Sequence, residues 1–476
     1  MPSHAGHHYG ALRAVLGNQI ISEGGKRLRL PARLTLLLLA AVFALCVYRA
    51  ATQAIVLDEA FTYTYFVKPP FAQMMTTYNT NDHIPNSLLA KATMGLFGMS
   101  EFTLRIPTLL CCLVYLFALR AIALAAFSGE WAVVTFALLS LHPLVLDLMS
   151  AARGYGPALA FLIAALWFLL RKEWAGSGLC LGLSTAANLA FLCPVGALGA
   201  MAALADTAKK TFGRFIDLVC IPAAVIPFVL YIVPLSRANP DQFQFGAPTM
   251  AEALESYIEL SFMDKWPPFP GLVVPGFEIL TVLILAGSAA AWVYLFRKRD
   301  GEPVDRLILL NGGALLAGVL ATWVAHVTAG AGYPWTRTGV FWPVMITLGG
   351  MALLYRFVQW RALRWVALAL ASLCLIHFVR ELRVDYFQEW KYDSGSKRIA
   401  NVILRDGGKG KVRVVTGPLL QFSLGFYRDM YRADWEIVED AKATGDYYVF
   451  KPEDARAELR VFYKDAVSGV VVQRGK

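Results

Sequence analysis

Charged residues are scarce in this chain: they make up 16% of its 476 residues, whereas hydrophobic residues make up 57%. A soluble globular domain carries about 25% charged residues, so this composition excludes an ordinary soluble protein. The net charge of +10 is not gathered into a Lys/Arg-rich patch with interleaved aromatics, which argues against a nucleic-acid partner. The basic residues lie between apolar segments, as topology signals do. We therefore expect a polytopic α-helical membrane protein in contact with membrane lipids.

The chain also lacks the cysteine pattern of a secreted or metal-binding domain. All seven cysteines lie in apolar stretches, so we expect neither a disulfide framework nor a cysteine-based metal site. Residues 1–29 lack the short apolar core and cleavage site of a signal peptide, and we expect them to form a cytosolic N-terminal lead-in. Their histidines, His4, His7 and His8, show no metal-binding pattern.

Long apolar runs dominate residues 30–380, which we interpret as the transmembrane domain. A spanning helix needs about 20 largely apolar residues, or fewer where protein shields its ends. Eleven such helices are expected, over residues 30–50, 105–127, 130–148, 155–171, 174–192, 194–207, 214–236, 271–296, 307–328, 338–356 and 363–380.

Lysine and arginine form five clusters around these segments: before the first helix, after the fourth, and after the sixth, eighth and tenth. With a cytosolic N-terminus, all five clusters lie on the cytosolic face. We expect an integral protein of a bacterial inner (plasma) membrane, with an extracytoplasmic C-terminus. The first outer loop, residues 51–104, and the piece 249–263 carry apolar residues at helical spacing. Short interfacial helices are therefore expected at 70–78, 85–97 and 249–263.

The tail, residues 381–476, changes character. Strand patterns at 412–416, 446–450 and 469–472 alternate with helix patterns at 394–405, 419–432 and 452–464. Such alternation predicts a small extracytoplasmic α/β domain with a parallel or mixed sheet. The tail carries no recognisable catalytic motif, so we expect it to be a lid, docking or stability domain.

The unusual polar residues fall on the outer side of the predicted membrane domain. Asp58 and Glu59 directly follow the first apolar segment, where two carboxylates are costly and mark a functional candidate. The simpler alternative is a hydrated acidic loop. His142, followed by Pro143, lies deeper and is interpreted as a packing residue. The remaining residues of this set are Lys68, Asp82, His83, Lys91, Arg105, Asp147, Arg153, Tyr155 and Arg337.

Such residues suit one chemistry in particular. A carboxylate at a membrane boundary can accept a proton from an incoming hydroxyl. Arginines can bind a phosphate through two hydrogen bonds and stabilise it as it departs. One base with cationic stabilisation of the leaving phosphate is what an inverting sugar transfer from a lipid phosphate requires. A general acid, as in two-carboxylate glycosidases, is not needed.

The order of motifs in the first half of the chain resembles the C-type (GT-C) integral-membrane glycosyltransferases. The resemblance is to the branch that holds protein O-mannosyltransferases and the lipid A aminoarabinose transferase. It rests on L-D-E-A-F-T-Y, N-D-H-I-P-N-S-L-L-A-K and L-F-G-M-S-E-F-T-L-R-I-P-T-L, in that order. Two later stretches, His142–Tyr155 and Tyr333–Gly339, resemble the branch's Glu-Ala-Arg-x-Tyr and late Arg-Tyr-x-x-Pro elements. The match spans about residues 30–345.

The resemblance implies that Asp58 is the catalytic base, with Glu59 beside it, and that Arg153 and Arg337 bind the lipid phosphate. It also places Asp82 and His83 in the pocket. Further substrate contacts are expected from Arg105 and Tyr155, although Arg105 and Arg153 could instead cap or anchor helix ends. No cofactor is certain: a divalent metal at Asp58, Asp82 and His83, or simple hydrogen bonding among them, both stay open.

The chain departs from the branch at four positions, Ile84, Asn86, Ala151 and Thr338, so the resemblance leaves the sugar and the acceptor (lipid, glycan or protein) undefined. The expected function is sugar transfer from a polyprenyl-phosphate-linked donor on the extracytoplasmic face. The alternative is a transporter or flippase of a lipid-linked sugar, which favours inverted repeats and ionisable residues at the bilayer midplane. An inactive scaffold leaves Asp58 and Glu59 unexplained.

Overall fold

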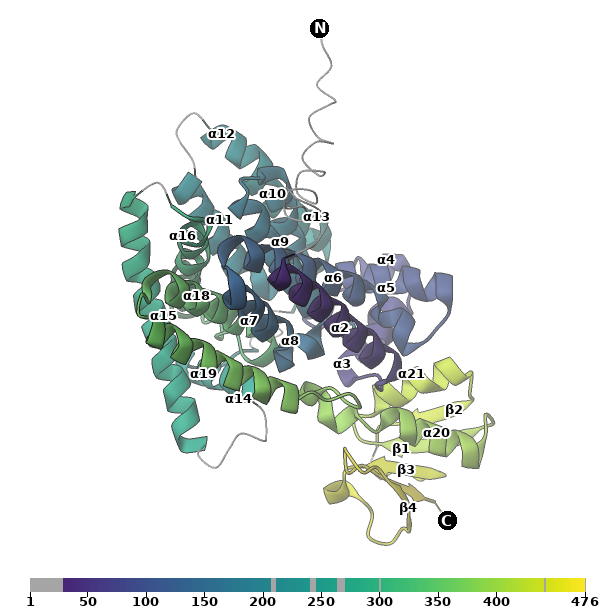
Figure 1. Cartoon of the computed structure of the whole chain (residues 1–476). Helices are drawn as coiled ribbons and strands as arrows, with labels where there is room; N and C mark the ends of the chain where they lie inside the picture. Colours follow the sequence, from purple (N-terminus) through teal and green to yellow (C-terminus); the bar gives the residue numbers. More distant parts are fainter. Residues whose placement is uncertain are drawn as a thin grey trace.

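The computed structural model describes residues 29–206, 211–239, 245–262, 270–298, 301–440 and 442–475. A helical body carries a smaller α/β domain at one end (Figure 1). The predicted fold class, a polytopic helical protein with a C-terminal α/β domain, is therefore confirmed. The lead-in with its three histidines lies outside the described residues, apart from Arg29.

Within the described ranges, seven helices are long and apolar enough to cross a membrane. They are α2 (Leu30–Thr52), α6 (Glu101–Ala126), α12 (Phe212–Phe215) continuing into α13 (Ile221–Leu235), α15 (Pro270–Lys298), α16 (Pro303–Leu307) continuing into α17 (Gly313–Ala329), Thr336–Phe357 with α18 (Phe341–Phe357), and α19 (Arg361–Arg380).

Four of the eleven predicted segments contain shorter helices: α7 (Gly129–Ser140), α9 (Tyr155–Leu170), α10 (Trp174–Ala187) and α11 (Leu192–Asp206). Helices of this length are tolerated because neighbouring helices cover them. Most residues of α9 are buried, and it packs between α6 and α10. Each predicted segment therefore contains a helix, but length and composition alone qualify fewer of them as spans.

The prediction of one helix over 130–148 is wrong. The helix breaks at Leu141–His142 and resumes as α8 (Pro143–Leu148). Pro143 causes the break, because the residue before a proline is disfavoured in the helical conformation; His142 accordingly has ψ 124°. His142 packs against the ring of Phe378 and lies 2.9 Å from the hydroxyl of Ser261, as a packing residue should.

The first outer loop is mostly helical. It contains α3 (Leu57–Thr62), which continues as a π-helical turn over Tyr63–Val67, then α4 (Phe71–Met74) and α5 (Ile84–Phe97). The helix predicted at 85–97 is confirmed, whereas that predicted at 70–78 is reduced to α4. The piece predicted at 249–263 forms α14 (Met250–Phe262).

The C-terminal domain has a mixed five-stranded sheet with strand order β2-β1-β3-β5-β4. β1 pairs in parallel with β2 and β3, and β5 pairs antiparallel with β3 and β4. The elements are α20 (Ser396–Gly407), β1 (Val412–Thr416), α21 (Gln421–Tyr431), β2 (Trp435–Val438), β3 (Tyr447–Phe450), β4 (Val461–Lys464) and β5 (Val471–Arg474).

Two predictions for this domain fail. The helix expected at 452–464 is wrong, because only a short turn, Pro452–Asp454, is helical and the segment ends in β4. Its last residues, Val461, Phe462 and Tyr463, are β-branched or aromatic and suit a strand better than a helix. Strand β2 was not predicted.

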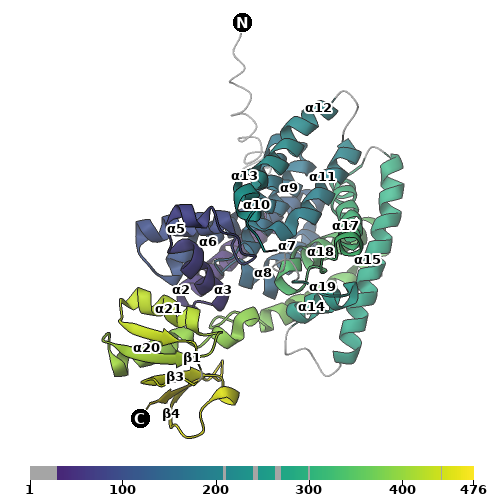
Figure 2. The ribbon, with the colours of Figure 1, turned by 180° about the vertical axis from the view of Figure 1, so that it is seen from behind.

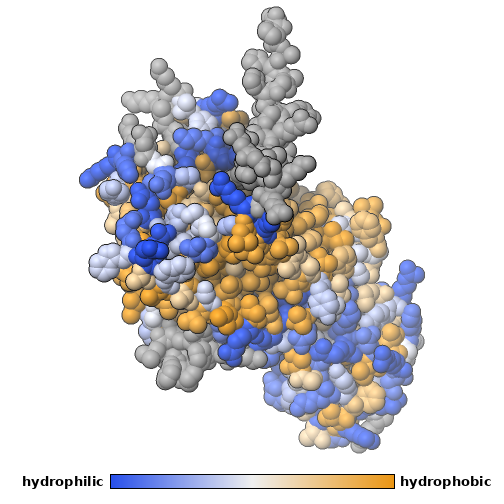
Figure 3. Space-filling view, in the orientation of Figure 1, coloured by the Kyte–Doolittle hydropathy of each residue, from blue (hydrophilic) through white to orange (hydrophobic). Residues whose placement is uncertain are grey.

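The C-terminal domain docks on the first outer loop. From behind, α21 lies beside α3 and α2 (Figure 2), and side chains of Tyr63, Leu424 and Tyr427 share one buried cluster. On the face seen in Figure 3, an apolar surface covers much of the helical body, whereas the C-terminal domain has a mostly polar surface. Helix α12, which carries Arg214, lies at the opposite end of the body (Figure 1). The orientation of the body in the membrane, with a cytosolic N-terminus, stays a prediction.

Candidate active site

Helix α3 places two adjacent carboxylates, Asp58 and Glu59, in its first turn, where the helix dipole favours negative charge. Both side chains are buried in the described structure: the exposed fraction is 6% for Asp58 and 0% for Glu59. The two carboxylates have different hydrogen-bond and ion-pair partners, however, so their chemical environments differ.

Asp58 lies between two guanidinium groups. Its Oδ2 atom is 3.0 Å from Nη2 of Arg337 and 3.8 Å from Nη2 of Arg153, and it accepts a 3.1 Å hydrogen bond from Nε1 of Trp390. Among the described residues, its Oδ1 atom accepts only a long contact, 3.4 Å, from Nδ2 of Asn81. Burial alone would raise the pKa of Asp58, but the two arginines and Trp390 outweigh burial and lower it. The carboxylate is therefore ionised at neutral pH.

Glu59 is bound on all sides by the protein. Its two oxygens accept hydrogen bonds from Nε and Nη2 of Arg105, at 2.8 and 2.6 Å, and from the backbone N–H groups of Val56 and Ala152. Arg105 is also fully buried and spends its other N–H groups on the carbonyls of Ala50, Gln53 and Ala54, at the end of α2. All five of its donors are used. This geometry favours the helix-end capping role for Arg105 over a substrate contact.

Arg153 is fully buried and organises the backbone around Asp58. It donates to the Asp58 carbonyl at 3.0 Å, to Oγ1 of Thr62 at 3.0 Å and to Oδ1 of Asn81 at 2.8 Å. The next residue must be glycine, because a Cβ on Gly154 would lie 2.1 Å from the Ala187 carbonyl oxygen. Arg153 therefore ties the 79–82 turn to α3.

Arg337 is the most accessible of the three arginines, with 20% of its side chain exposed. Its Nη1 lies 2.7 Å from Oε1 of Glu389, and its guanidinium lies over the rings of Trp390 and Phe245 at 5.6 and 5.9 Å. Among the described residues, its Nε–H has no hydrogen-bond partner. Arg337 is thus held between two carboxylates, those of Asp58 and Glu389.

Asp82 and His83 are both buried next to this group. Oδ1 of Asp82 accepts from Ser87 at 2.8 Å, while Oδ2 has no partner in the described parts of the chain. Burial raises the pKa of Asp82 to about 7, although Ser87 and Arg153 partly oppose it. Burial, followed by the charges of Arg153 and Arg337, lowers the pKa of His83 well below its usual value.

Tyr155 meets the His83 ring edge-on at 5.1 Å and lies 5.8 Å below the Arg153 guanidinium.

Among the described residues, no three His, Cys, Asp or Glu side chains form a group that could hold a metal ion. The metal set considered from the sequence, Asp58 with Asp82 and His83, is therefore not assembled. Two lysines of the polar set predicted from the sequence have partners elsewhere. Lys68 pairs with Asp429 at 2.6 Å, and Lys91 donates to the Val67 carbonyl at 2.6 Å.

Sequence reasoning missed Glu389 and Trp390, which the short 3₁₀ helix Gln388–Asp393 places beside Asp58. This helix follows α19 and is anchored by Asp147, whose Oδ2 accepts from the N–H of Gln388 at 2.8 Å. Asp147 in turn pairs with Arg49 of α2. The available signal was a carboxylate next to a tryptophan shortly after the last membrane helix, on the same predicted outer side as Asp58.

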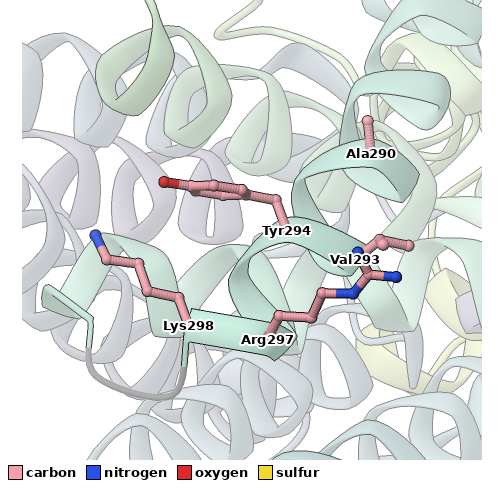
Figure 4. Close-up of a pocket in the computed structure, with 5 residues that line it drawn as sticks. All are labelled: Ala290, Val293, Tyr294, Arg297 and Lys298. Atoms are coloured by element: carbon pink, nitrogen blue, oxygen red, sulfur yellow. The ribbon is translucent and has the colours of Figure 1, made fainter.

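Two open pockets lie elsewhere on the described surface. One is lined by Ala290, Val293, Tyr294, Arg297 and Lys298, all from α15 (Figure 4). These residues lie toward the end of α15 that is remote from the C-terminal domain (Figure 1). The other is lined by Trp335, which lies two residues before Arg337, and on its α14 side by Glu252, Glu255, Ser256 and Glu259.

No protein-family model and no curated protein sequence matches the chain. The chain is similar to solved structures of ArnT from Cupriavidus metallidurans. The structure bound to undecaprenyl phosphate has 14% identity and a TM-score of 0.42, with 92% of this chain and 97% of that chain covered. The apo structure has 14% identity and a TM-score of 0.44, with the same coverage. The arabinosyltransferase EmbB from Mycobacterium smegmatis has 11% identity and a TM-score of 0.37, over 89% of this chain and 43% of that chain.

Proposed function

We propose that this protein is an integral-membrane glycosyltransferase that moves a sugar from a polyprenyl-phosphate-linked donor to an acceptor hydroxyl on the extracytoplasmic face. The observation that carries the proposal is the Asp58 carboxylate, 3.0 Å from the guanidinium of Arg337, whose side chain is partly exposed. A base and a phosphate-binding cation thus lie together beside the ends of membrane helices. The acceptor, whether a lipid, a glycan or a protein, supplies the hydroxyl.

In the proposed reaction, Asp58 takes the proton of the acceptor hydroxyl as the acceptor oxygen attacks C1 of the sugar. The O–C1 bond forms while the bond from C1 to the phosphate oxygen breaks. The polyprenyl phosphate leaves with the bonding electron pair, and its charge is stabilised by Arg337. A single displacement of this kind inverts the configuration at C1.

The arginines divide into two kinds in this proposal. Arg337 has 20% of its side chain exposed, so it is assigned to the donor phosphate. Arg105 and Arg153 are fully buried and bind the protein itself. They are assigned to positioning, as is Glu59 through its pairing with Arg105. Asp82, His83 and Tyr155 are assigned to the wall of the pocket.

The test is transfer of a sugar from a synthetic undecaprenyl-phosphate donor, the carrier that ArnT of Cupriavidus metallidurans binds. Asp58→Asn keeps the size of the side chain but cannot accept the proton. We expect the transfer rate to fall by about 10²–10⁴-fold, with expression and donor binding retained. The matched control is Asp385→Asn, which changes an exposed carboxylate of the same outer side. Near-normal transfer by Asp58→Asn would refute the assignment of the base.

A further inference from the structure

The two oxygens of the Asp58 carboxylate have unequal surroundings. Oδ2 accepts from the indole N–H of Trp390 at 3.1 Å and lies 3.0 Å from Nη2 of Arg337, with Arg153 a little further away at 3.8 Å. Within the described parts of the chain, Oδ1 has only the 3.4 Å contact with Nδ2 of Asn81. Because close donors occupy the lone pairs of Oδ2, a proton arriving at this carboxylate finds its free lone pairs on Oδ1.

Trp390, which holds Oδ2, comes from the segment after the last membrane helix. Its side chain is 1% exposed, so the indole is fixed by packing and its N–H has a constant direction. It is 332 positions away from Asp58 in the sequence. The same segment supplies Glu389, whose Oε1 lies 2.7 Å from Nη1 of Arg337. One short piece of chain thus contacts both the proposed base and the proposed phosphate ligand.

This segment is anchored at both ends. At its start, the N–H groups of Gln388 and Glu389 donate to Asp147, which pairs with Arg49 in α2. At its end, the fully buried Asp393 accepts from the N–H of Leu57, the first residue of α3. These contacts fix the segment to the helix that carries Asp58 and to the body beneath it.

The C-terminal domain is coupled to the same place. Oδ1 of Asp393 accepts from the hydroxyl of Ser423 in α21 at 3.0 Å. The hydroxyl of Ser396 in α20 donates to the Ile55 carbonyl at 3.1 Å, and that of Tyr427 accepts from the Ile55 N–H at 2.9 Å. Docking of the domain therefore constrains the residues that lead directly into α3.

We propose that the segment Gln388–Asp393 completes the active site: Trp390 orients the Asp58 carboxylate so that Oδ1 receives the acceptor's proton, and Glu389 holds Arg337 for the donor phosphate. Both are positioning residues, and the inference rests on the proposed function. In the transfer step, the proton of the acceptor hydroxyl goes to Oδ1 while the sugar passes from phosphate to the acceptor oxygen. The C-terminal domain then contributes to catalysis by positioning these residues.

The first test is Trp390→Phe in the full-length protein, with kcat and kcat/KM measured across pH on the undecaprenyl-phosphate donor. Removing a hydrogen bond to a charged group should lower kcat by about 10- to 100-fold. Since the indole N–H lowers the pKa of Asp58, its loss should also move the acid limb of the profile to higher pH. A merely structural tryptophan would not move that limb.

The matched control is Trp435→Phe. Trp435 is also buried, lies in the same C-terminal domain and donates from Nε1 at 3.1 Å, but to the Gly408 carbonyl. Its loss should leave the acid limb where it is. An unshifted acid limb in a folded, active Trp390→Phe enzyme overturns the inference while the proposed function stands. A wild-type protein that transfers no sugar overturns both.

The second variant, Glu389→Gln, does not depend on how Trp390→Phe folds. Gln keeps the size of the side chain but replaces the ion pair with Arg337 by a neutral hydrogen bond. We expect the KM for the donor to rise by about five- to tenfold with little change in kcat, because a charged hydrogen bond is stronger than a neutral one. An unchanged donor KM overturns the role of Glu389.

Discussion

Glu59→Gln tests whether the two adjacent carboxylates have separate roles. Glu59 accepts four hydrogen bonds, two from Arg105 and two from backbone N–H groups, and neither it nor Arg105 is exposed. Gln keeps the shape of the side chain but has one oxygen where Glu has two. Its amide N–H groups then face donors, and the Arg105 guanidinium is left buried without a counter-ion.

The expected cost follows from this burial. Breaking a buried ion pair by neutralising one partner costs about 3–5 kcal/mol, because the remaining charge is uncompensated. Whole domains are stable by only about 5–15 kcal/mol. Glu59→Gln should therefore lower the unfolding temperature of the purified protein by several degrees and reduce the amount that accumulates in the membrane. Asp58→Asn should lower the transfer rate, but it should lower the unfolding temperature less than Glu59→Gln does.

Thermal unfolding of the two variants in the same detergent checks this expectation, together with transfer by the folded fraction. Glu173→Gln is the matched control. Glu173 also pairs with an arginine, Arg171, but its side chain is 43% exposed, and such surface pairs contribute about 0–1 kcal/mol. If Glu59→Gln unfolds like the wild type yet loses as much transfer as Asp58→Asn, Glu59 takes part in the chemistry and the positioning role is refuted.

Two further predictions concern the rest of the site. Arg337→Lys should raise the donor KM by roughly 10- to 100-fold with an unchanged unfolding temperature, because a lysine offers a point charge and no planar fork; an unchanged KM places the phosphate elsewhere. Asp82 has a pKa of about 7 in the folded protein against about 4 when exposed. Its contribution to stability is thus complete below pH 4 and lost as the pH rises through 7. In Asp82→Asn, that part of the decline in unfolding temperature between about pH 4 and 7 should be absent. The same slope of unfolding temperature against pH in the variant and the wild type would contradict a buried, protonated Asp82.

The membrane architecture could be predicted from the sequence because hydropathy is a local property. A run such as Leu30–Thr52 must be covered by lipid or protein wherever it lies, and every predicted segment contains a helix in the described structure. The failures are also local. Pro143 splits a helix that looked continuous by composition, and Val461–Lys464 forms a strand although its apolar residues also fit a helical spacing.

The sequence by itself also predicted that Asp58, Arg153 and Arg337 lie on one side of the membrane domain, next to apolar segments, and the three side chains come together in the structure. Only the tertiary structure decided how the charges pair. Glu59 and Arg105 are 46 positions apart, and Trp390 is 332 positions from Asp58. Hydrogen bonds and ion pairs act over a few ångströms in space, and nothing in the spacing of residues along the chain encodes which of several nearby arginines a buried carboxylate will meet.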